Sequence, residues 1–251
     1  MPKAVKVYPK TRLYFKPHTT AMVLKTREKE MFMTARLNPG IYGILTEKFS
    51  RGRSNIQVAQ EMVNAGVTTL QYREKPASKS MGEMYKECVA IRQITRDAGV
   101  TFIVNDHADL ALMVEADGIH TGQDDLPLRP LRKLVGDMII GRSTHSLDQA
   151  RQAVLEGADY IGVGPIFTTQ TKEGVCDAVG LAYLDHVAAN IAIPFVAIGG
   201  IKAHNLGQVV SHGARTVCMI TEIIGAEDIK ATIQGLQTIY KDTSAKLYQA
   251  L

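Results

Sequence analysis

The chain has 251 residues, of which 45% are hydrophobic and 22% are charged, and this ordinary globular composition excludes wholesale disorder. Its 29 lysine and arginine residues outnumber its 25 aspartate and glutamate residues by four, and a net charge of +4 over this length indicates neither a nucleic-acid partner nor a membrane surface. No stretch approaches the ~18 consecutive apolar residues of a membrane span. Composition alone leaves two small domains or one large α/β unit open.

The three cysteines, Cys88, Cys176 and Cys218, lie far apart in the sequence. Their number is odd and no CxxC pair occurs, so a disulfide framework is not expected. Unpaired cysteines are typical of a reducing compartment, and we expect a cytoplasmic protein.

The first 39 residues differ from the rest of the chain. Between Met1 and Arg27 there are seven basic residues and no acidic one, and no apolar run of the signal-peptide kind occurs. We therefore expect residues 1–39 to form a basic N-terminal extension that ends at the Asn38-Pro39-Gly40 turn signal. An organelle-targeting arm remains an alternative, although serine is absent from this segment.

After Gly40, short apolar runs rich in β-forming residues recur along the chain. These runs are Ile41–Leu45, Thr68–Tyr72, Thr101–Asn105, Gly118–His120, Met138–Gly141, Tyr160–Val163, Phe195–Ile198 and Thr216–Ile220. Stretches with helical periodicity lie between them, namely Ile56–Asn64, Met84–Ala98, Leu147–Glu156, Leu181–Asn190 and Leu206–His212, and Ile229–Tyr240 follows the last run.

The spacing of these runs predicts one repeating unit. The first and eighth runs begin near residues 41 and 216, so seven intervals average about 25 residues each, the length of one βα unit. Several helical stretches end in a glycine beside an alanine, as at Ala65-Gly66 and Ala98-Gly99, and glycine is the usual helix C-cap residue. We predict a single α/β domain, a (β/α)8 TIM barrel over residues 40–251. An open doubly wound sheet is less favoured, because it usually has fewer strands and no GxGxxG follows the first run.

Charged residues follow the second, third and fourth predicted strands, where a barrel carries its chemistry. In Gln71–Lys75, Arg73 and Lys75 alternate and so share one face of an extended chain. Asn105-Asp106 and Gly122–Asp125 place carboxylates at neighbouring strand ends, where they could hold Mg²⁺, or could instead cap helices.

Hydroxyl groups, amides and glycines follow the remaining strands. Gly141–His145 contains Ser143, and the loop Gly164–Lys172 brings several hydroxyl and amide side chains together with a lysine. Gly199-Gly200 and Thr221 follow the seventh and eighth strands, where barrels commonly bind phosphate. Each feature alone could be a cap or a solvated loop. Together they predict a metal-bound pyrophosphate on one side of the barrel mouth and a monophosphate on the other.

These segments resemble the thiamine-phosphate synthase family over about residues 40 to 225. The resemblance rests on Gln71–Lys75 (Q-L-R-E-K in the family), Asn105-Asp106, His120–Asp125, Gly141–His145, Gly162–Lys172 (GxGPxFxTxTK in the family) and Ala197–Ile201. The chain departs from the common pattern at Glu47, Tyr72, His107, Arg142 and Thr168. None of these departures removes an implied ligand, but Arg142 puts the local geometry of Ser143 in question.

The resemblance implies a role for each matching residue. It implies catalytic roles for Arg73, Lys75, Ser143 and Lys172, and Mg²⁺ ligands at Asp106 and Asp125. The implied pyrimidine and diphosphate site contains Gln71, Tyr72, Arg73, Glu74, Lys75, Asn105, Ser143 and Lys172. The implied thiazole phosphate site contains Thr169, Gln170, Thr171, Gly200, Ile220 and Thr221.

The implied activity is that of a Mg²⁺-dependent transferase that joins a pyrimidine diphosphate to a thiazole phosphate by dissociative substitution. No general base is needed, because the attacking thiazole nitrogen carries no proton, and the sequence offers no obvious Ser-His-Asp arrangement or zinc spacing. Two alternatives remain, a thiazole tautomerase-like isomerase on the same barrel and a non-catalytic regulator that binds thiamine phosphate. The expected partners are small-molecule substrates, and a homo-oligomer is possible. The sequence does not decide whether the thiazole substrate carries an additional carboxylate.

Overall fold

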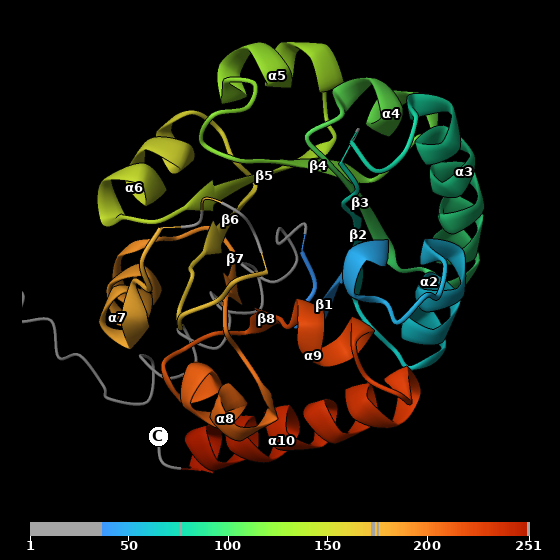
Figure 1. Ribbon diagram of the computed structural model, residues 1–251. Helices are drawn as coiled ribbons and strands as arrows, with labels where there is room; N and C mark the ends of the chain where they lie inside the picture. The colour runs from blue at the N-terminus through green and yellow to red at the C-terminus, as the bar shows by residue number, and fades with distance from the viewer. Residues whose placement is uncertain (1–36, 76, 172–173, 175, 250–251) are drawn as a thin grey trace, which may run out of the picture. The chain divides into compact units, whose positions relative to one another are not determined.

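The computed structural model describes residues 37–75, 77–171, 174 and 176–249. Eight parallel strands close into a barrel in the order of the sequence, with β1 hydrogen-bonded to β8, and helices surround the ring (Figure 1). The prediction of a (β/α)8 barrel is confirmed. The predicted extension over residues 1–39 lies outside the described residues, except for its last three.

The strands are short, as expected for a barrel of this kind. They are β1 (Gly40–Leu45), β2 (Thr69–Tyr72), β3 (Thr101–Asn105), β4 (Gly118–Thr121), β5 (Ile139–Thr144), β6 (Tyr160–Val163), β7 (Phe195–Ile198) and β8 (Thr216–Cys218). The helices are η1 (Glu47–Phe49), α2 (Asn55–Asn64), α3 (Met81–Ala98), α4 (Ala108–Met113), α5 (Leu128–Val135), α6 (Leu147–Leu155), α7 (Gly180–Asn190), α8 (Ala203–Ser211), α9 (Ile220–Ile224) and α10 (Ile229–Gln249).

The main differences from the predicted elements lie at short segments. The eighth strand ends at Cys218 instead of Ile220, because Ile220 begins helix α9. The fifth strand continues to Thr144, past the predicted end at Gly141. Helices α4 and α9 have six and five residues, too few turns for a periodic apolar pattern to be visible in the sequence.

Local signals in the sequence define several helix ends. Ser54 and Ser80 cap α2 and α3 in capping boxes completed by Gln57 and Glu83, which satisfies backbone N–H groups that the first turn leaves unpaired. Glycines with positive φ follow five of the helices, among them Gly136 after α5, and only glycine adopts this conformation at little cost. The other four are Gly66, Gly99, Gly157 and Gly213.

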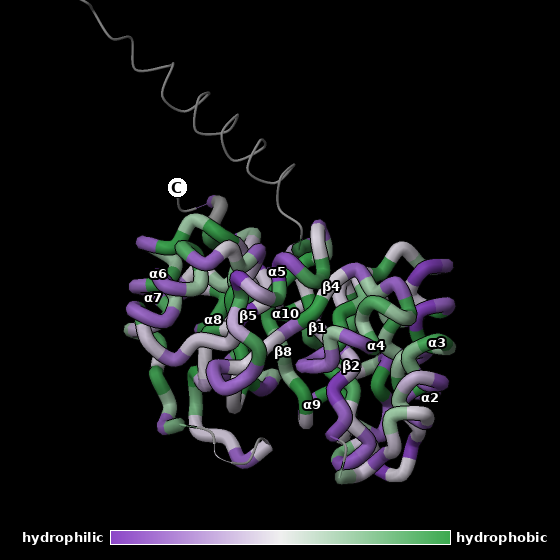
Figure 2. Tube along the Cα trace, turned by 90° about the horizontal axis from the view of Figure 1, so that it is seen from above, coloured by the Kyte–Doolittle hydropathy of each residue, from purple (hydrophilic) through white to green (hydrophobic). Residues whose placement is uncertain are grey.

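Two apolar clusters hold the barrel together. The larger one packs the outward faces of the strands against the helices, and the smaller one fills the ring with side chains that include Tyr42, Ile103, Tyr160 and Val196. Figure 2 shows hydrophobic positions along the central strands and hydrophilic positions on the outer turns of the helices. Among the helices described here, none is both long and apolar enough to cross a membrane. Within the same residues the cysteines are unpaired, two of them buried and Cys176 exposed.

Candidate active site

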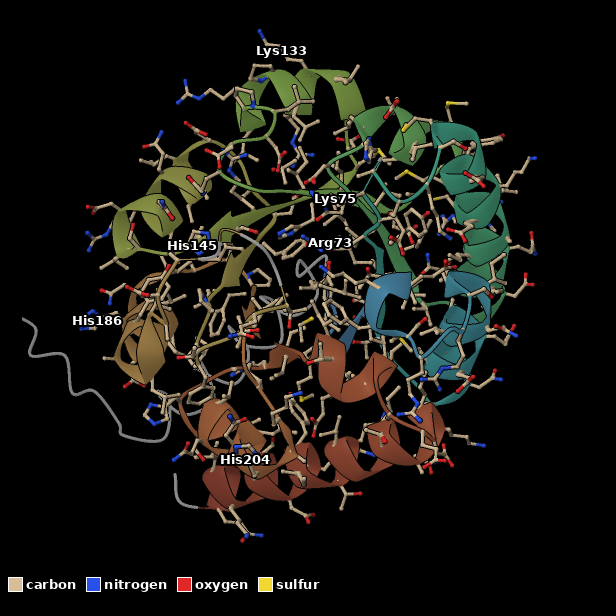
Figure 3. The ribbon with its side chains drawn as sticks, in the orientation of Figure 1. Arg73, Lys75, Lys133, His145, His186 and His204 are labelled. Carbon is tan, nitrogen blue, oxygen red and sulfur yellow. The ribbon has the colours of Figure 1, made fainter. Side chains whose placement is uncertain are left out.

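A cavity of about 760 Å³ opens where the strands end at their carboxyl side, which is the functional face of this architecture. Most residues implied by the sequence line this cavity. They are Gln71, Arg73, Lys75, Asn105, Asp106, Asp125, Ser143, Thr169, Gln170, Thr171, Gly200, Ile220 and Thr221. Figure 3 shows Arg73 and Lys75 inside the ring of helices, whereas Lys133, His186 and His204 lie on the outer helices. Lys172 is outside the described residues.

The chain leaving β2 directs two cations into the cavity. Lys75 Nζ lies 3.0 Å from Asp106 Oδ2, so this lysine is paired with a carboxylate from the end of β3. The guanidinium of Arg73 forms no hydrogen bond or ion pair with any side chain in the described part of the protein. Arg73 is therefore available to bind an anionic ligand.

Tyr72 and Glu74 alternate with these residues and point away from the cavity. The Tyr72 hydroxyl donates to Glu87 Oε2 at 2.6 Å. Glu74 Oε1 accepts hydrogen bonds from the Glu47 backbone N–H at 2.6 Å and from Asn55 Nδ2 at 2.9 Å. The implied contacts of Tyr72 and Glu74 with substrate are therefore corrected. Through these hydrogen bonds, both side chains stabilise the segment that carries Arg73 and Lys75.

The two implied metal ligands lie side by side. Burial raises the pKa of Asp106 and the neighbouring Asp125 carboxylate raises it further, while the Lys75 ammonium opposes both effects. The Asp125 carboxylate also accepts a hydrogen bond from the Gly122 N–H at 2.7 Å. Helix α4 begins after His107 without a side-chain cap, so the alternative that Asp106 caps this helix does not hold.

This carboxylate pair suits Mg²⁺. Two adjacent carboxylates destabilise each other's charge unless a cation lies between them. Within the described residues, no group of three or more His, Cys, Asp or Glu side chains gathers to hold a metal ion. A site of two carboxylates fits Mg²⁺, which keeps several waters and takes its other ligands from substrate phosphates.

A chain of hydrogen bonds crosses the floor of the cavity. Gln71 Nε2 donates to the Tyr42 hydroxyl at 2.8 Å, and this hydroxyl lies 2.9 Å from that of Tyr160. His120 Nδ1 lies 2.9 Å from the Tyr160 hydroxyl, and His120 Nε2 lies 2.9 Å from Ser143 Oγ. No local pattern in the sequence indicates a partner for Ser143, because His120 and Ser143 meet only through the register of β4 and β5, in which His120 pairs with Gly141.

Arg142 does not disturb Ser143. The two residues alternate along β5, and the Arg142 side chain is directed away from the cavity and is buried. Its guanidinium donates to Thr121 Oγ1 and to the backbone carbonyls of Gln123 and Leu126, each at 3.2 Å. Arg142 thus holds the loop after β4, which contains Asp125.

The opposite side of the cavity is built from hydroxyl groups. The hydroxyls of Thr169 and Thr171 lie 3.1 Å apart after β6, and Thr221 follows β8. Lys202, which the sequence analysis did not identify, lines the same side and donates from Nζ to Thr221 Oγ1 at 3.0 Å. Its ammonium also pairs with Glu222 at 3.2 Å. The only signal in the sequence is that Lys202 follows the glycine pair by two positions.

Comparison with known proteins identifies the family of this chain. Residues 41–223 match the family model described as thiamine monophosphate synthase. The chain belongs to this family. The thiamine-phosphate synthase of Pelotomaculum thermopropionicum is 58% identical over 208 residues, which cover 82% of this chain and 94% of that protein. That of Caldicellulosiruptor bescii is 52% identical over 202 residues, which cover 80% and 91% of the two chains.

A solved structure of the same family has the same fold. The thiamine phosphate pyrophosphorylase from Pyrococcus furiosus superimposes with a TM-score of 0.76 at 31% sequence identity. The match covers 84% of this chain and 98% of the other chain, so it includes nearly the whole of that enzyme. The resemblance drawn from the motifs is thereby confirmed.

Proposed function

We propose that the chain is a transferase that condenses 4-amino-2-methyl-5-(diphosphooxymethyl)pyrimidine with a thiazole phosphate, giving thiamine phosphate and pyrophosphate. The observation that carries this proposal is one cavity with two different anion-binding sides. Arg73 and Lys75 lie beside a carboxylate pair on one side, and threonine hydroxyls with Lys202 form the other. The names of the relatives support the same activity.

The charged residues bind the diphosphate and stabilise it as it leaves. The bond between the pyrimidine methylene carbon and the diphosphate oxygen breaks, and its electron pair goes to pyrophosphate. Arg73 and Lys75 offer positive charge already in place where negative charge develops, which is the form of electrostatic catalysis that costs no rearrangement. The family resemblance adds Lys172 to this set. Ser143 adds a hydroxyl at the same side. Mg²⁺ held by Asp106 and Asp125 would supply Lewis-acid stabilisation of the same oxygens.

The thiazole nitrogen then forms the new bond to the methylene carbon. Thr169, Gln170, Thr171 and Thr221 would hold the thiazole phosphate so that the nitrogen faces this carbon. The nitrogen carries no proton, so the residues of this side bind and orient the substrate without acting as a base. Apolar side chains in the lining, among them Phe49 and Ile198, would reduce the access of water to the cationic carbon.

The two alternative functions are not supported. An isomerase that shifts a double bond needs acid and base groups and has no use for a pair of metal-binding carboxylates. The relatives reported above carry the name of the synthase. A homo-oligomeric state and a cytoplasmic location stay predictions.

The proposal is tested by incubating the full chain with both substrates and Mg²⁺ while measuring thiamine phosphate and pyrophosphate. We expect the two products in equal amounts, and we expect Arg73→Gln to reduce their formation by at least a hundredfold. Arg96→Gln is the matched control, since Arg96 lies on α3 and pairs with the exposed Glu115. Pyrophosphate released without thiamine phosphate would indicate a hydrolase, and no product at all would favour a binding protein.

A further inference from the structure

Five side chains that line the cavity form one continuous chain of hydrogen bonds. Tyr42, Gln71, His120, Ser143 and Tyr160 come from five different strands. We call this set the floor chain. Tyr42 and Tyr160 are buried, and burial raises the pKa of each phenol above its ordinary value, so both hydroxyls keep their protons.

The direction of hydrogen-bond donation along the floor chain follows from Gln71. Gln71 donates from its amide nitrogen, which cannot accept a hydrogen bond, so the proton of Tyr42 must point elsewhere. The Tyr160 oxygen lies 2.9 Å away and is the acceptor that the chain offers. Gln71 and Cys218 also neighbour both phenols; the Gln71 amide nitrogen only donates, and the Cys218 sulfur is a weak acceptor.

The same reasoning fixes the remaining protons. Because Tyr160 accepts from Tyr42, its own proton is free to donate to His120 Nδ1. His120 then carries its proton on Nε2 and donates it to Ser143 Oγ. The proton of Ser143 is left for the cavity, which Ser143 lines. With the opposite order, the buried Tyr42 proton would face the amide N–H of Gln71, which costs the desolvation of an unpaired donor.

Gly141 provides the space for this contact. A Cβ atom at this position would lie 2.2 Å from Tyr160 Cζ and 2.5 Å from His120 Nδ1, closer than real Cβ atoms approach. Gly141 pairs with both His120 and Tyr160 in the sheet, so any side chain there would separate the two rings. The backbone is therefore built to bring the phenol to the imidazole.

We propose that His120 is a positioning residue that acts through Ser143. In this proposal, which rests on the proposed function for the identity of the ligand, the floor chain holds His120 as the Nε2–H tautomer. Ser143 then presents its proton to a diphosphate oxygen, and Gln71 presents its carbonyl oxygen to the amino group of the pyrimidine. The Gln71 carbonyl oxygen accepts no hydrogen bond from the described residues, and Gln71 lines the cavity.

This arrangement has a chemical consequence for Ser143. A serine becomes a nucleophile when an adjacent imidazole nitrogen accepts its proton. His120 Nε2 is already protonated in the floor chain, so Ser143 keeps its proton and serves as a hydrogen-bond donor. The Ser143–His120 pair therefore does not attack the diphosphate, which stays intact until the pyrimidine carbon releases it.

The tautomer is tested directly by NMR of the full chain with ¹⁵N-labelled histidine. The signals of His120 are identified by their loss in His120→Gln, and we expect a protonated Nε2 and an unprotonated Nδ1 in the wild-type protein. Tyr160→Phe removes the donor to Nδ1, and we expect the signals to shift toward a mixture of both tautomers. Tyr183→Phe is the matched control, because this hydroxyl bonds to Thr144, beside Ser143, without touching the floor chain. A wild-type imidazole protonated on Nδ1 would overturn the inference.

Steady-state kinetics provide the second readout. We expect Tyr160→Phe to lower kcat/KM for the pyrimidine diphosphate about tenfold, the effect of one hydrogen bond, with the KM for the thiazole phosphate unchanged. His120→Gln keeps a donor near the position of Nε2 and should retain more activity than His120→Asn, which loses it. Equal changes in both KM values, or an Asn variant as active as the Gln variant, would contradict the positioning role.

The two proposals can fail separately. A protonated Nε2 in a protein that forms no thiamine phosphate would refute the proposed function and leave the floor chain intact. A protonated Nδ1 in an active enzyme would refute the inference alone. The wild-type NMR measurement decides the tautomer even where a variant fails to fold.

Discussion

Replacing Asp125 by asparagine should stabilise the protein in the absence of divalent cations while removing its activity. The two carboxylates of Asp106 and Asp125 lie side by side, and each disfavours the charge of the other. Asparagine removes one charge but keeps an oxygen that can accept the hydrogen bond from the Gly122 N–H. A purely structural carboxylate would show the opposite sign, because its replacement would cost stability.

The expected gain is about 1 kcal/mol. Two like charges about 4 Å apart repel by about 1 kcal/mol in water and about 4 kcal/mol at the effective dielectric constant of a protein surface. The lower figure applies, because Asp125 is exposed and Lys75 Nζ lies 3.0 Å from Asp106. For a domain of this size, about 1 kcal/mol corresponds to a rise in Tm of about 2–4 °C.

The change of folding stability with pH provides an independent test of this repulsion. Because the pKa of Asp106 is raised above its ordinary value of 3.8, the folded protein without metal holds this proton more tightly than the unfolded chain does. Stability is therefore lost as the pH rises through that raised pKa. We expect a smaller loss in Asp125→Asn, which lacks the second carboxylate.

The assay is thermal unfolding in chelator and in Mg²⁺, together with the rate of thiamine phosphate formation. Asp124→Asn is the matched control, since Asp124 is the adjacent exposed aspartate and does not line the cavity. The control should change neither quantity. A lower Tm of Asp125→Asn in chelator, or full Mg²⁺-dependent activity, would refute the reasoning.

Three further substitutions distinguish a residue that binds substrate from residues that stabilise the structure. Lys202→Gln should raise the KM for the thiazole phosphate about tenfold and leave that for the pyrimidine diphosphate unchanged, because a charged donor to phosphate is lost. Tyr72→Phe should cost about 2 kcal/mol of stability in denaturant unfolding, since Glu87 loses a donor, with both KM values unchanged. Arg53→Met should cost about 2–4 kcal/mol in the same measurement, because this guanidinium donates to the carbonyls of Ile224 and Ala226 at 2.7 Å. Unchanged stability of Tyr72→Phe or Arg53→Met, or an equal rise in both KM values for Lys202→Gln, would contradict these assignments.

The order of the elements could be predicted from the sequence because each βα unit carries local signals. Apolar runs recur at a spacing of about 25 residues, and several of the helical stretches between them end in glycine. The end of β8 could not be predicted, since Met219-Ile220 is equally compatible with a strand and with the short helix that follows. At five residues, α9 depends on tertiary packing more than on its own propensity.

Features of the candidate site could be predicted where they depend on the residues of a single strand. They could not be predicted where they depend on the register between two strands. The alternation in Gln71–Lys75 indicated that Arg73 and Lys75 share a face. The same alternation places Tyr72 and Glu74 on the other face, so the motif as a whole was the wrong unit for assigning substrate contacts. The contact of His120 with Ser143 depends on the register between β4 and β5, which no local pattern specifies.

The pairing of β1 with β8 has a consequence for biosynthesis. The first strand leaves the ribosome long before its partner, because 178 positions separate Gly40 from Cys218. At translation rates of about 5–20 residues per second, the edge of β1 waits roughly 9–36 s for that partner. Throughout this interval an unpaired edge of backbone N–H and C=O groups is open to pairing with another nascent chain. Closure of the ring by β8 is therefore the step that both removes this hazard and brings Thr221 into the cavity that Arg73 also lines.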